Sequence, residues 1–385
     1  MKVLIITRHF LDQNAGGPNA SKAFITALIE IYKQCTLIYP EHNNKNSCNY
    51  IPVHVKALPC YDNRSLIKKG IDIYRGRLHR FMEFVKSHLQ QNQYDLVVID
   101  HSLTGAEIID IVRKTKMKII TIHHNVESKY VKDNLPNCLY RIPYIYFSNK
   151  AEKDCLKYSD LNLTLTEIDT KYFIDKFNVN PSKIKNIGVF EMKNATTIPP
   201  VFSFKERSHN PILVISGSLN FPQSEKPIIN FINHYYCLLL KKYPDCKLII
   251  TGRNPSKKLI SICLKYPTIQ LIPNPKSMSD VISLGNIYIC PIYAGSGIKL
   301  RIMDGLRRGL PILSHEISAN GYESIEKAGY LFKYNTPETF INSFSIMYNQ
   351  NFEAEKIYET FINYFSYNSG KERIRKILFD AKLIN

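Results

Sequence analysis

Residues 291–314 of the chain read PIYAGSGIKLRIMDGLRRGLPILS, a glycine-rich and basic stretch between two apolar ends. Five of the sixteen glycines of the chain fall between residues 295 and 321. Glycine permits sharp turns and a close approach of the backbone to a ligand, so Gly295 and Gly297 predict a turn after a buried strand. Residues 298–308 are then expected to form a helix whose first turn offers backbone N–H groups to an anion.

The charged residues of this stretch fit a nucleoside diphosphate. Lys299 and Arg301 fall in the first turn of the expected helix, where a bound diphosphate would turn an unfavourable dipole interaction into attraction. Asp304 follows roughly 9 Å further along the axis at 1.5 Å per residue and can accept hydrogen bonds from ribose hydroxyls. The alternative is that the glycines only turn the chain and that both cations are solvated.

Short apolar runs alternate with helical patterns on both sides of this stretch, which is typical of parallel strands joined by crossover helices. The strands expected in the first half are residues 3–7, 36–39, 53–57, 96–99, 118–122, 161–165 and 184–187. Those expected in the second half are residues 212–215, 247–251, 269–272, 287–292 and 311–314. The sequence therefore predicts an α/β chain with two Rossmann-like, doubly wound parallel sheets, whose ligands lie beyond the carboxyl ends of the strands.

The expected division follows the interruption of this pattern. A first domain covers residues 1–190, and a second covers residues 212–365. Between them, residues 191–211 have no apolar period and contain prolines and charges, which suits a linker. Helical patterns at residues 340–348, 354–364 and 372–383 end the chain.

Composition narrows the class of partner. The chain of 385 residues has 51 Lys and Arg against 33 Asp and Glu, a formal net charge of +18, which attracts phosphate-bearing molecules, anionic lipid or nucleic acid. No RNA-recognition, zinc-finger or helix-turn-helix pattern accompanies the charge, so we expect no nucleic acid. The nine scattered cysteines form no C-x-x-C pair and fit a reducing compartment. No secretory or membrane-spanning apolar run occurs, so we expect a cytoplasmic protein.

Polar residues follow the expected strand 118–122. A neutral His124 at this strand end can hydrogen-bond a sugar hydroxyl, and Asn125 and Glu127 stand where an acceptor would be held. Metal ligation lacks a third ligand at a suitable spacing, so no metal is expected. The alternative for the neighbouring His123 is that it only satisfies backbone groups, and His9 after the first strand is equally ambiguous.

Other loops also follow strands. Gly16 and Gly17 precede an expected helix over residues 20–32 and expose backbone, although the dinucleotide fingerprint G-x-G-x-x-G is absent and an ordinary turn is the alternative. In the second half, loops contain Gly217 and Ser218, Arg253, and Ile272, Pro273 and Asn274. Arg253 could support a diphosphate, and residues 272–274 could contact a planar base, but each loop alone is a weak signal.

Residues 64–85 form a basic amphipathic stretch. Six Lys or Arg stand against one Asp between residues 64 and 80, interleaved with Leu66, Ile67 and Ile71. Such a segment can lie peripherally on an anionic membrane, here the inner face of the cell membrane. The alternative is a solvated crossover helix with one face in the core.

Taken together, these residues resemble the large family of retaining glycosyltransferases with the GT-B fold, the group 1 or family 4-like enzymes. The most specific similarity is between GSGIKLRIMDGLRRGLPILS and the family pattern GSGIKxKxxEAxAxGxPVxS. HNVE at residues 124–127, the early Gly-Gly loop and GSLNFPQ at residues 217–223 agree in order and spacing. In this family two Rossmann-like domains face each other across a cleft, and the last helix, here residues 366–385, crosses back onto the first domain.

The resemblance implies transfer of a hexose-type sugar from a nucleotide-diphosphate sugar to a glycan or lipid-linked acceptor in surface polysaccharide synthesis, with retention and without metal or other cofactor. The acceptor would bind the first domain. The donor diphosphate would bind at Ser296, Gly297, Ile298 and Lys299, with the ribose at Asp304 and the base near residues 272–274. His124 would lie near the reacting sugar, and the amides of residues 16 and 17 near the donor phosphate or the acceptor.

Two departures from the family pattern are visible. Ser296 and the shorter Asp304 stand where the family often has two glutamates, and residues 217–226 offer only Lys226 in place of an Arg and Lys pair. They keep two alternatives open, a sugar-nucleotide epimerase on the same fold and a catalytically silent partner subunit. An epimerase would leave the mass of the nucleotide sugar unchanged, and a silent subunit would bind no nucleotide sugar.

Overall fold

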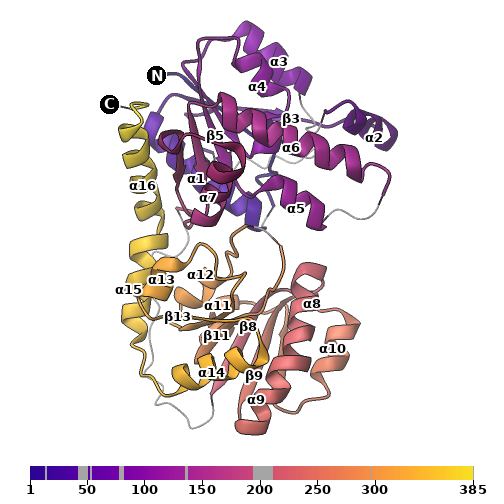
Figure 1. The fold of residues 1–385 in the computed structure, drawn as a ribbon, viewed down its shortest axis with the longest axis vertical. Helices are drawn as coiled ribbons and strands as arrows, with labels where there is room; N and C mark the ends of the chain where they lie inside the picture. Colours follow the sequence, from indigo (N-terminus) through magenta and orange to yellow (C-terminus); the bar gives the residue numbers. More distant parts are fainter. Residues whose placement is uncertain are drawn as a thin grey trace. The chain divides into compact units, whose positions relative to one another are not determined.

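The structure is a computed structural model that describes all residues except 14, 42–50, 53, 78–81, 135–137, 194–210, 296 and 385. The chain divides into two compact units (Figure 1). Unit 1 consists of Met1–Ala195 and Ser366–Asn385, and unit 2 of Thr196–Phe365. Most of the expected linker 191–211 lies outside the described residues.

Unit 1 is built on a parallel sheet of seven strands in the order β3-β2-β1-β4-β5-β6-β7. The strands are β1 Val3–Thr7, β2 Cys35–Pro40, β3 Lys56–Cys60, β4 Leu96–Asp100, β5 Lys118–His123, β6 Leu161–Thr164 and β7 Ile184–Asn186. Every residue of β1, β2 and β4 is buried, as expected for a parallel sheet covered by helices on both faces.

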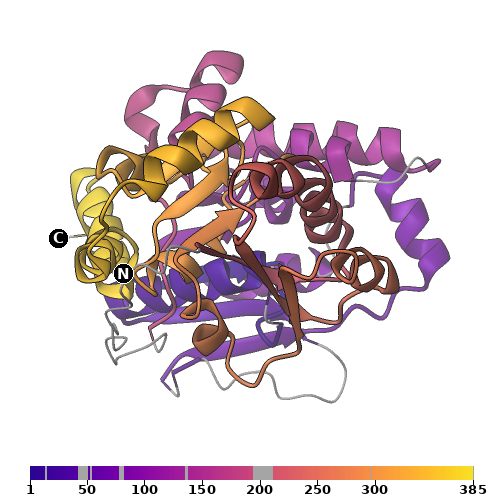
Figure 2. The same cartoon turned by 90° about the horizontal axis from the view of Figure 1, so that it is seen from below.

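Helices cover both faces of this sheet (Figures 1 and 2). They are α1 Gly16–Tyr32, α2 Leu66–Tyr74, α3 Met82–Gln91, η1 Ser102–Gly105, α4 Ile108–Val112, α5 Glu127–Asn134, α6 Arg141–Tyr158, α7 Glu167–Phe177, η2 Pro181–Lys183 and α16 Tyr367–Asp380. The last helix packs along α1, where Lys371 Nζ donates to Glu30 Oε2 at 3.0 Å. A side chain at Gly370 would collide with Phe190, so the close approach of α16 requires glycine there.

Unit 2 contains a parallel sheet of six strands in the order β10-β9-β8-β11-β12-β13. The strands are β8 Ile212–Ser218, β9 Lys247–Arg253, β10 Ile269–Pro273, β11 Ile287–Cys290, β12 Ile312–His315 and β13 Leu331–Tyr334. The helices are α8 Pro222–Phe231, η3 Ile232–Tyr236, α9 Cys237–Lys242, α10 Lys257–Cys263, α11 Met278–Ile282, α12 Ile302–Leu306, α13 Glu323–Lys327, α14 Pro337–Tyr348 and α15 Ala354–Phe365. Large aromatic side chains of α8, η3 and α14 fill the core of this unit.

The fold class is confirmed, because both sheets are parallel, α/β and doubly wound. The strand order reverses between β1 and β4 in unit 1 and between β8 and β11 in unit 2. Ligands of such sheets bind beside these reversal points, at the carboxyl ends of the strands. Among the described residues, no helix is long and apolar enough to cross a bilayer.

Three details of the expected element assignment are wrong. The strand expected at residues 53–57 is Lys56–Cys60, an edge strand that tolerates Pro59, whose missing N–H faces no neighbour. Strand β13 was not expected, because its four residues LFKY are too few to show an alternating pattern. The helix expected over 298–308 is only α12, Ile302–Leu306.

Candidate functional site

In unit 1 the candidate site is centred on Asp100, the last residue of β4, which is fully buried. Thr7 Oγ1, at the end of β1, donates to Asp100 Oδ2 at 2.6 Å, so this bond joins the two strands that flank the reversal point. Ser21 Oγ of α1 donates to the same oxygen at 2.6 Å, and His124 Nε2 lies 2.7 Å from Oδ1. One carboxylate therefore ties together β1, α1, β4 and the loop after β5.

Three histidines gather beside this carboxylate. The ring centroids of His9, His101 and His124 are 5.3–5.4 Å apart in each pair. His101 has φ of 82°, a backbone conformation that costs energy for any residue except glycine. It is held there because its Nε2 lies 3.1 Å from Glu127 Oε1 and its Nδ1 accepts from Leu103 N at 3.3 Å.

Burial sets the ionisation of this cluster. It lowers the pKa of His9 well below its ordinary value, and the neighbouring His124 and His101 add to the effect. Burial also lowers the pKa of His101, although the nearby Glu127 acts in the opposite direction. Burial alone would raise the pKa of Asp100, but attraction and hydrogen bonding from His124 outweigh it, and the net pKa is below the ordinary value. The cluster thus combines the ionised carboxylates of Asp100 and Glu127 with a neutral His9.

Several buried polar atoms at this edge have no hydrogen-bond partner among the described residues. Arg8 Nη1 and His9 Nε2 make no hydrogen bond within the part of the chain that the structure describes. Burying a polar group without a hydrogen bond costs about 1–3 kcal/mol. A ligand with oxygen atoms, such as a sugar or a phosphate, would supply the missing acceptors.

The predicted residues of unit 1 are largely brought together here. Helix α1 begins at Gly16, not at residue 20, and its N-cap Ala15 provides no side-chain hydrogen bond. A Cβ on Gly17 would lie 2.8 Å from His9 Cε1, so the Gly-Gly loop packs directly against the histidine cluster. Asn125 Nδ2 donates to Glu127 Oε1 at 3.1 Å.

His123 does not join the site. Its Nε2 lies 3.0 Å from Asn162 Oδ1 on the neighbouring strand β6, and its ring packs against Phe173. Because successive side chains of a strand point to opposite faces, His123 and His124 have different surroundings. His123 therefore has a side-chain amide as its partner where backbone groups were expected, while its buried Nδ1 has no hydrogen-bond partner within the described residues.

A second buried carboxyl supports the loop after β5. Glu152 of α6 accepts from the backbone N–H of Glu127 at 2.7 Å and from Ser128 Oγ at 3.1 Å. Burial raises the pKa of Glu152 to about 8, and the nearby Glu127 charge adds to the shift, while the two hydrogen bonds oppose it. Glu152 is therefore mostly protonated at neutral pH.

Glu152→Gln is expected to make the chain less sensitive to pH. A carboxyl whose pKa rises from 4.5 in the unfolded chain to about 8 in the folded chain contributes stability below pH 4.5 and loses it as the pH rises towards 8. Between pH 5 and pH 7 the wild-type chain should lose about 2 kcal/mol more of its free energy of unfolding than the glutamine variant. Urea denaturation at both pH values measures this difference, and parallel pH profiles of the two proteins would contradict it.

In unit 2 the candidate site lies at the reversal point between β8 and β11. Arg301 Nη1 donates to the carbonyl oxygen of Ser216 at 3.2 Å, and Nη2 donates to Ser224 Oγ at 2.8 Å. Its guanidinium lies so close to Gly217 that a Cβ there would be 2.7 Å from Nη1. The loop after β11 is thereby fastened to the end of β8, 85 residues earlier in the chain, and to the first turn of α8.

Lys299 closes the glycine loop. Its Nζ donates to the carbonyl oxygens of Gly295 at 3.2 Å and Gly297 at 2.9 Å, and Tyr322 Oη donates to the carbonyl of Lys299 at 3.0 Å. Both glycines have positive φ, 92° and 76°. Residues 298 and 299 have no regular structure and residues 300 and 301 form a turn, so the residues of the expected anion site lie in a loop before α12 and not at a helix N-terminus. The predicted site residue Ser296 lies outside the described residues.

Asp304 lies in the first turn of α12, beside Arg301. Burial raises its pKa to about 6, while the charges of Arg301 and Arg308 act in the opposite direction. The structure also explains the glycine after it, since a Cβ on Gly305 would lie 2.6 Å from the ring of Tyr288. Arg307 Nη1 lies 3.6 Å from Asp304 Oδ1, and the Arg307 guanidinium lies over the ring of Phe361 in α15.

The remaining predicted residues line the same edge of this sheet. Gly217 and Gly252 approach so closely that a Cβ on Gly252 would lie 1.7 Å from the carbonyl oxygen of Gly217. Asn274 N donates to the carbonyl of Gly252 at 2.8 Å, and Asn274 Oδ1 accepts from Asn254 N at 3.0 Å. Ser218 and Arg253 are exposed partners in the register of β8 and β9, and Ile272 and Pro273 end β10.

Sequence reasoning missed several residues of the unit 1 site. Asp100 and His101 contact the predicted residues His124 and Glu127, and Thr7 and Ser21 contact Asp100, but none of these four residues was predicted. The available signal was Asp100-His101 at the end of an apolar strand, the same kind of position as His124. Within the described ranges, no group of three or more His, Cys, Asp or Glu could hold a metal ion.

One protein family and one relative each match part of this chain. Residues 210–350, which include the loop of Lys299 and Asp304, match the family described as Glycosyl transferases group 1. An uncharacterized 44.6 kDa protein in the cps region of Klebsiella pneumoniae is 26% identical over 239 residues, which are 60% of this chain and 59% of that protein. The chain thus matches about three fifths of the length of this relative.

Solved structures resemble the chain over nearly its full length. The lipopolysaccharide outer core galactosyltransferase WaaB has a TM-score of 0.68 at 12% identity, over 98% of this chain and 99% of that one. HepE of Anabaena in complex with UDP has a TM-score of 0.68 at 11% identity, over 98% of this chain and 100% of that one. A glycosyltransferase from Rickettsia africae ESF-5 has a TM-score of 0.66 at 13% identity, over 99% of this chain and 98% of that one. The fold is that of the GT-B glycosyltransferases, and fold and family match together support a transferase of this type.

Proposed function

We propose that this chain transfers a hexose-type sugar from a nucleotide-diphosphate sugar to a glycan or lipid-linked acceptor in cell-surface polysaccharide synthesis, with retention at the anomeric carbon. The observation that carries the proposal is the Arg301 bridge from the loop after β11 to the end of β8 and the first turn of α8. It places two cations, Lys299 and Arg301, and the carboxyl of Asp304 at the point of the sheet where nucleotides bind in such folds.

The relatives support the chemical class of the substrate. HepE of Anabaena is described in complex with UDP, WaaB is described as a galactosyltransferase, and the Klebsiella relative is described as lying in a cps region. A nucleoside diphosphate is the part common to such donors. We therefore assign the donor to unit 2, with the diphosphate at residues 295–301 and the base near residues 272–274.

The cations would act on the leaving group. Negative charge builds up on the departing diphosphate as the glycosidic bond breaks, and positioned cations stabilise that charge more than the ground state. Asp304 would accept hydrogen bonds from the ribose, for which it must be ionised. Because burial holds the pKa of Asp304 at about 6, this function favours a pH above 6.

Unit 1 would hold the acceptor and contact the reacting sugar. His124 is fastened to Asp100, which fixes the orientation of its ring. The buried Arg8 Nη1 provides a hydrogen-bond donor for hydroxyl or phosphate oxygens, and Nε2 of the neutral His9, beside the Gly-Gly loop, can donate or accept according to its tautomer. We propose that Asn125 and Glu127 fix the acceptor, with no metal and no other cofactor in the reaction.

A thermal-shift screen tests the proposal. The purified chain is heated with UDP-, GDP- and ADP-sugars, and with the corresponding sugar 1-phosphates as controls that lack the nucleotide. A ligand present at 100 times its Kd stabilises the folded chain by about 2.7 kcal/mol, so the correct donor should raise the melting temperature and its sugar phosphate should not.

Mass spectrometry and NMR of the incubated donor and acceptor then separate the enzyme classes. A transferase adds the mass of a sugar to the acceptor, an epimerase leaves the mass of the nucleotide sugar unchanged but alters its NMR spectrum, and a silent subunit changes neither. No thermal shift with any nucleotide sugar would contradict the proposed donor site.

A further inference from the structure

Helix α2 of unit 1 is oriented opposite to an ordinary surface helix. Its apolar residues point into solvent, with Leu66 84% and Ile67 77% exposed and Ile71 and Tyr74 also exposed. The residue of α2 that is buried is the acidic Asp72. The sequence left open a crossover helix with one face in the core, but the structure places the apolar face outside.

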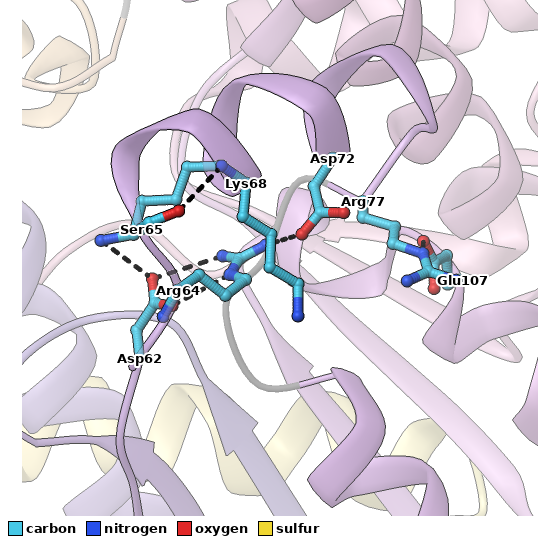
Figure 3. A network of polar contacts seen from close by, with 8 residues as sticks. Asp62, Arg64, Ser65, Lys68, Asp72, Arg77 and Glu107 are labelled. Carbon is cyan, nitrogen blue, oxygen red and sulfur yellow. Dashed lines mark hydrogen bonds and ion pairs between the residues drawn. The ribbon is translucent and has the colours of Figure 1, made fainter.

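Polar contacts hold α2 in this orientation (Figure 3). Arg64 donates from Nη1 to Asp72 at 2.9 Å and from Nε to Asp62 at 2.9 Å. The helix end is fixed by Gly76, whose φ is 74° and which packs so closely on Phe147 of α6 that a Cβ would lie 2.8 Å from the ring. These contacts therefore fix the outward orientation of the apolar face of α2 in unit 1.

The start of α6 extends this apolar surface. Leu139 is 91% and Ile142 80% exposed, and Tyr140 and Tyr146 are exposed as well. Tyr74 Oη donates to the carbonyl of Leu139 at 3.0 Å, which connects the two segments, and Figures 1 and 2 both show α2 beside α6. We call the following eight residues the apolar patch: Leu66, Ile67, Ile71, Tyr74, Leu139, Tyr140, Ile142 and Tyr146.

Exposed large apolar side chains are concentrated in the apolar patch. It contains eight of the twenty large apolar side chains that are exposed among the described residues, within two short segments. Soluble proteins seldom leave contiguous apolar surface of this kind uncovered unless it binds a partner or a membrane.

The charges around the apolar patch select the partner. Lys68, Arg75 and Lys132 are exposed on the same segments or next to them, and Arg77 is exposed with its Nε 3.9 Å from Glu107 Oε1. Asp62 and Asp72 are paired with Arg64 and Lys69. A second copy of the chain would bring the same positive charges, in a protein whose net charge is already +18. Apolar side chains framed by Lys and Arg instead complement a bilayer with anionic headgroups.

We propose that the apolar patch docks this chain on an anionic membrane surface. Leu66, Ile67, Leu139 and Ile142 enter the boundary between headgroups and acyl chains, and the flanking lysines and arginines contact lipid phosphates. The binding needs no sugar donor or acceptor, so it stands independently of the proposed transferase activity.

Vesicle co-sedimentation of the full chain tests the proposal. With vesicles of phosphatidylcholine and phosphatidylglycerol, Ile142→Asp is expected to lower the partition coefficient about tenfold, because it removes one apolar anchor and adds a charge that anionic lipid repels. Leu264→Asp is the matched control, since Leu264 is 81% exposed in unit 2 and lies outside the apolar patch. Its partition coefficient should stay at the wild-type value.

Two further measurements make the result unambiguous. Ile142 is in the first turn of α6, where aspartate favours the helix dipole, so the variant should keep the wild-type melting temperature. Pure phosphatidylcholine vesicles, or anionic vesicles at high salt, should bind the wild-type chain about tenfold more weakly.

Equal loss of binding in Ile142→Asp and Leu264→Asp, or wild-type binding by Ile142→Asp, would overturn the proposal. So would a concentration-dependent dimer in sedimentation velocity that Ile142→Asp abolishes while vesicle binding persists, because the patch would then be covered by a second copy.

Discussion

Lys299→Ala is expected to lower kcat/KM for sugar transfer by about 10³-fold, since removing one group that stabilises developing charge in the transition state costs about 10²–10³-fold and the loop is loosened as well. In the wild-type structure Lys299 Nζ holds the carbonyls of Gly295 and Gly297, so it both shapes the loop and supplies its positive charge. Steady-state kinetics with the donor found by the thermal-shift screen measure the loss.

The division of the loss between kcat and KM identifies its cause. Stabilisation of the leaving diphosphate should appear mainly in kcat, whereas a collapsed loop would raise KM and lower the melting temperature. Lys258→Ala removes an exposed lysine of α10 in the same unit and should leave both constants unchanged. Turnover of Lys299→Ala within a few-fold of wild type would contradict the assigned diphosphate site.

Asp100→Ala is expected to lower the free energy of unfolding by about 3–5 kcal/mol, because it leaves three buried donors without their acceptor. These donors are Thr7 Oγ1, Ser21 Oγ and His124 Nε2. The variant should also lose transferase activity, since His124 is no longer held in place. Urea denaturation at pH 7 measures the stability.

The exposed Asp110→Ala is the control for Asp100, since its ion pair with Arg113 lies on the surface of α4 and such pairs contribute less than about 1 kcal/mol. The pH dependence gives a second check. The pKa of Asp100 lies below its ordinary value in the folded chain, so its contribution is present above about pH 4 and is lost on further acidification. Asp100→Ala should therefore lose less stability than wild type below pH 4. Equal stability of Asp100→Ala and Asp110→Ala at pH 7 would contradict the central position of this carboxylate.

Much of the candidate site could be predicted because it lies at strand ends. The apolar runs before Gly217, His124 and Gly295 mark buried strands, and in a parallel sheet the residues after each strand reach the same edge. Glycine and polar residues at those positions then identified the loops. The structure places the predicted residues of each unit at that edge, with Ser296 outside the described residues.

The residues that could not be predicted depend on which strands are neighbours. Asp100 is part of the site because β4 lies between β1 and β5, so that it meets Thr7 on one side and His124 on the other. Arg301 was expected in a helix facing a ligand, but it reaches Ser216 and Ser224 because β8 and β11 are adjacent. No local pattern contains these pairings.

The sequence by itself determined the parallel α/β class, most strands, the glycine loop at residues 295–297 and the basic, amphipathic character of residues 64–85, because periodicity and residue type act over a few neighbouring positions. Only the tertiary structure decided that His124 is fastened to Asp100, that the loop of Lys299 precedes its helix, and that α2 turns its apolar face outwards. The physical reason is that these outcomes depend on contacts between residues far apart in the chain. Which face of an amphipathic helix is buried is decided by what it packs against, and for α2 that is the Arg64–Asp72 ion pair and Phe147.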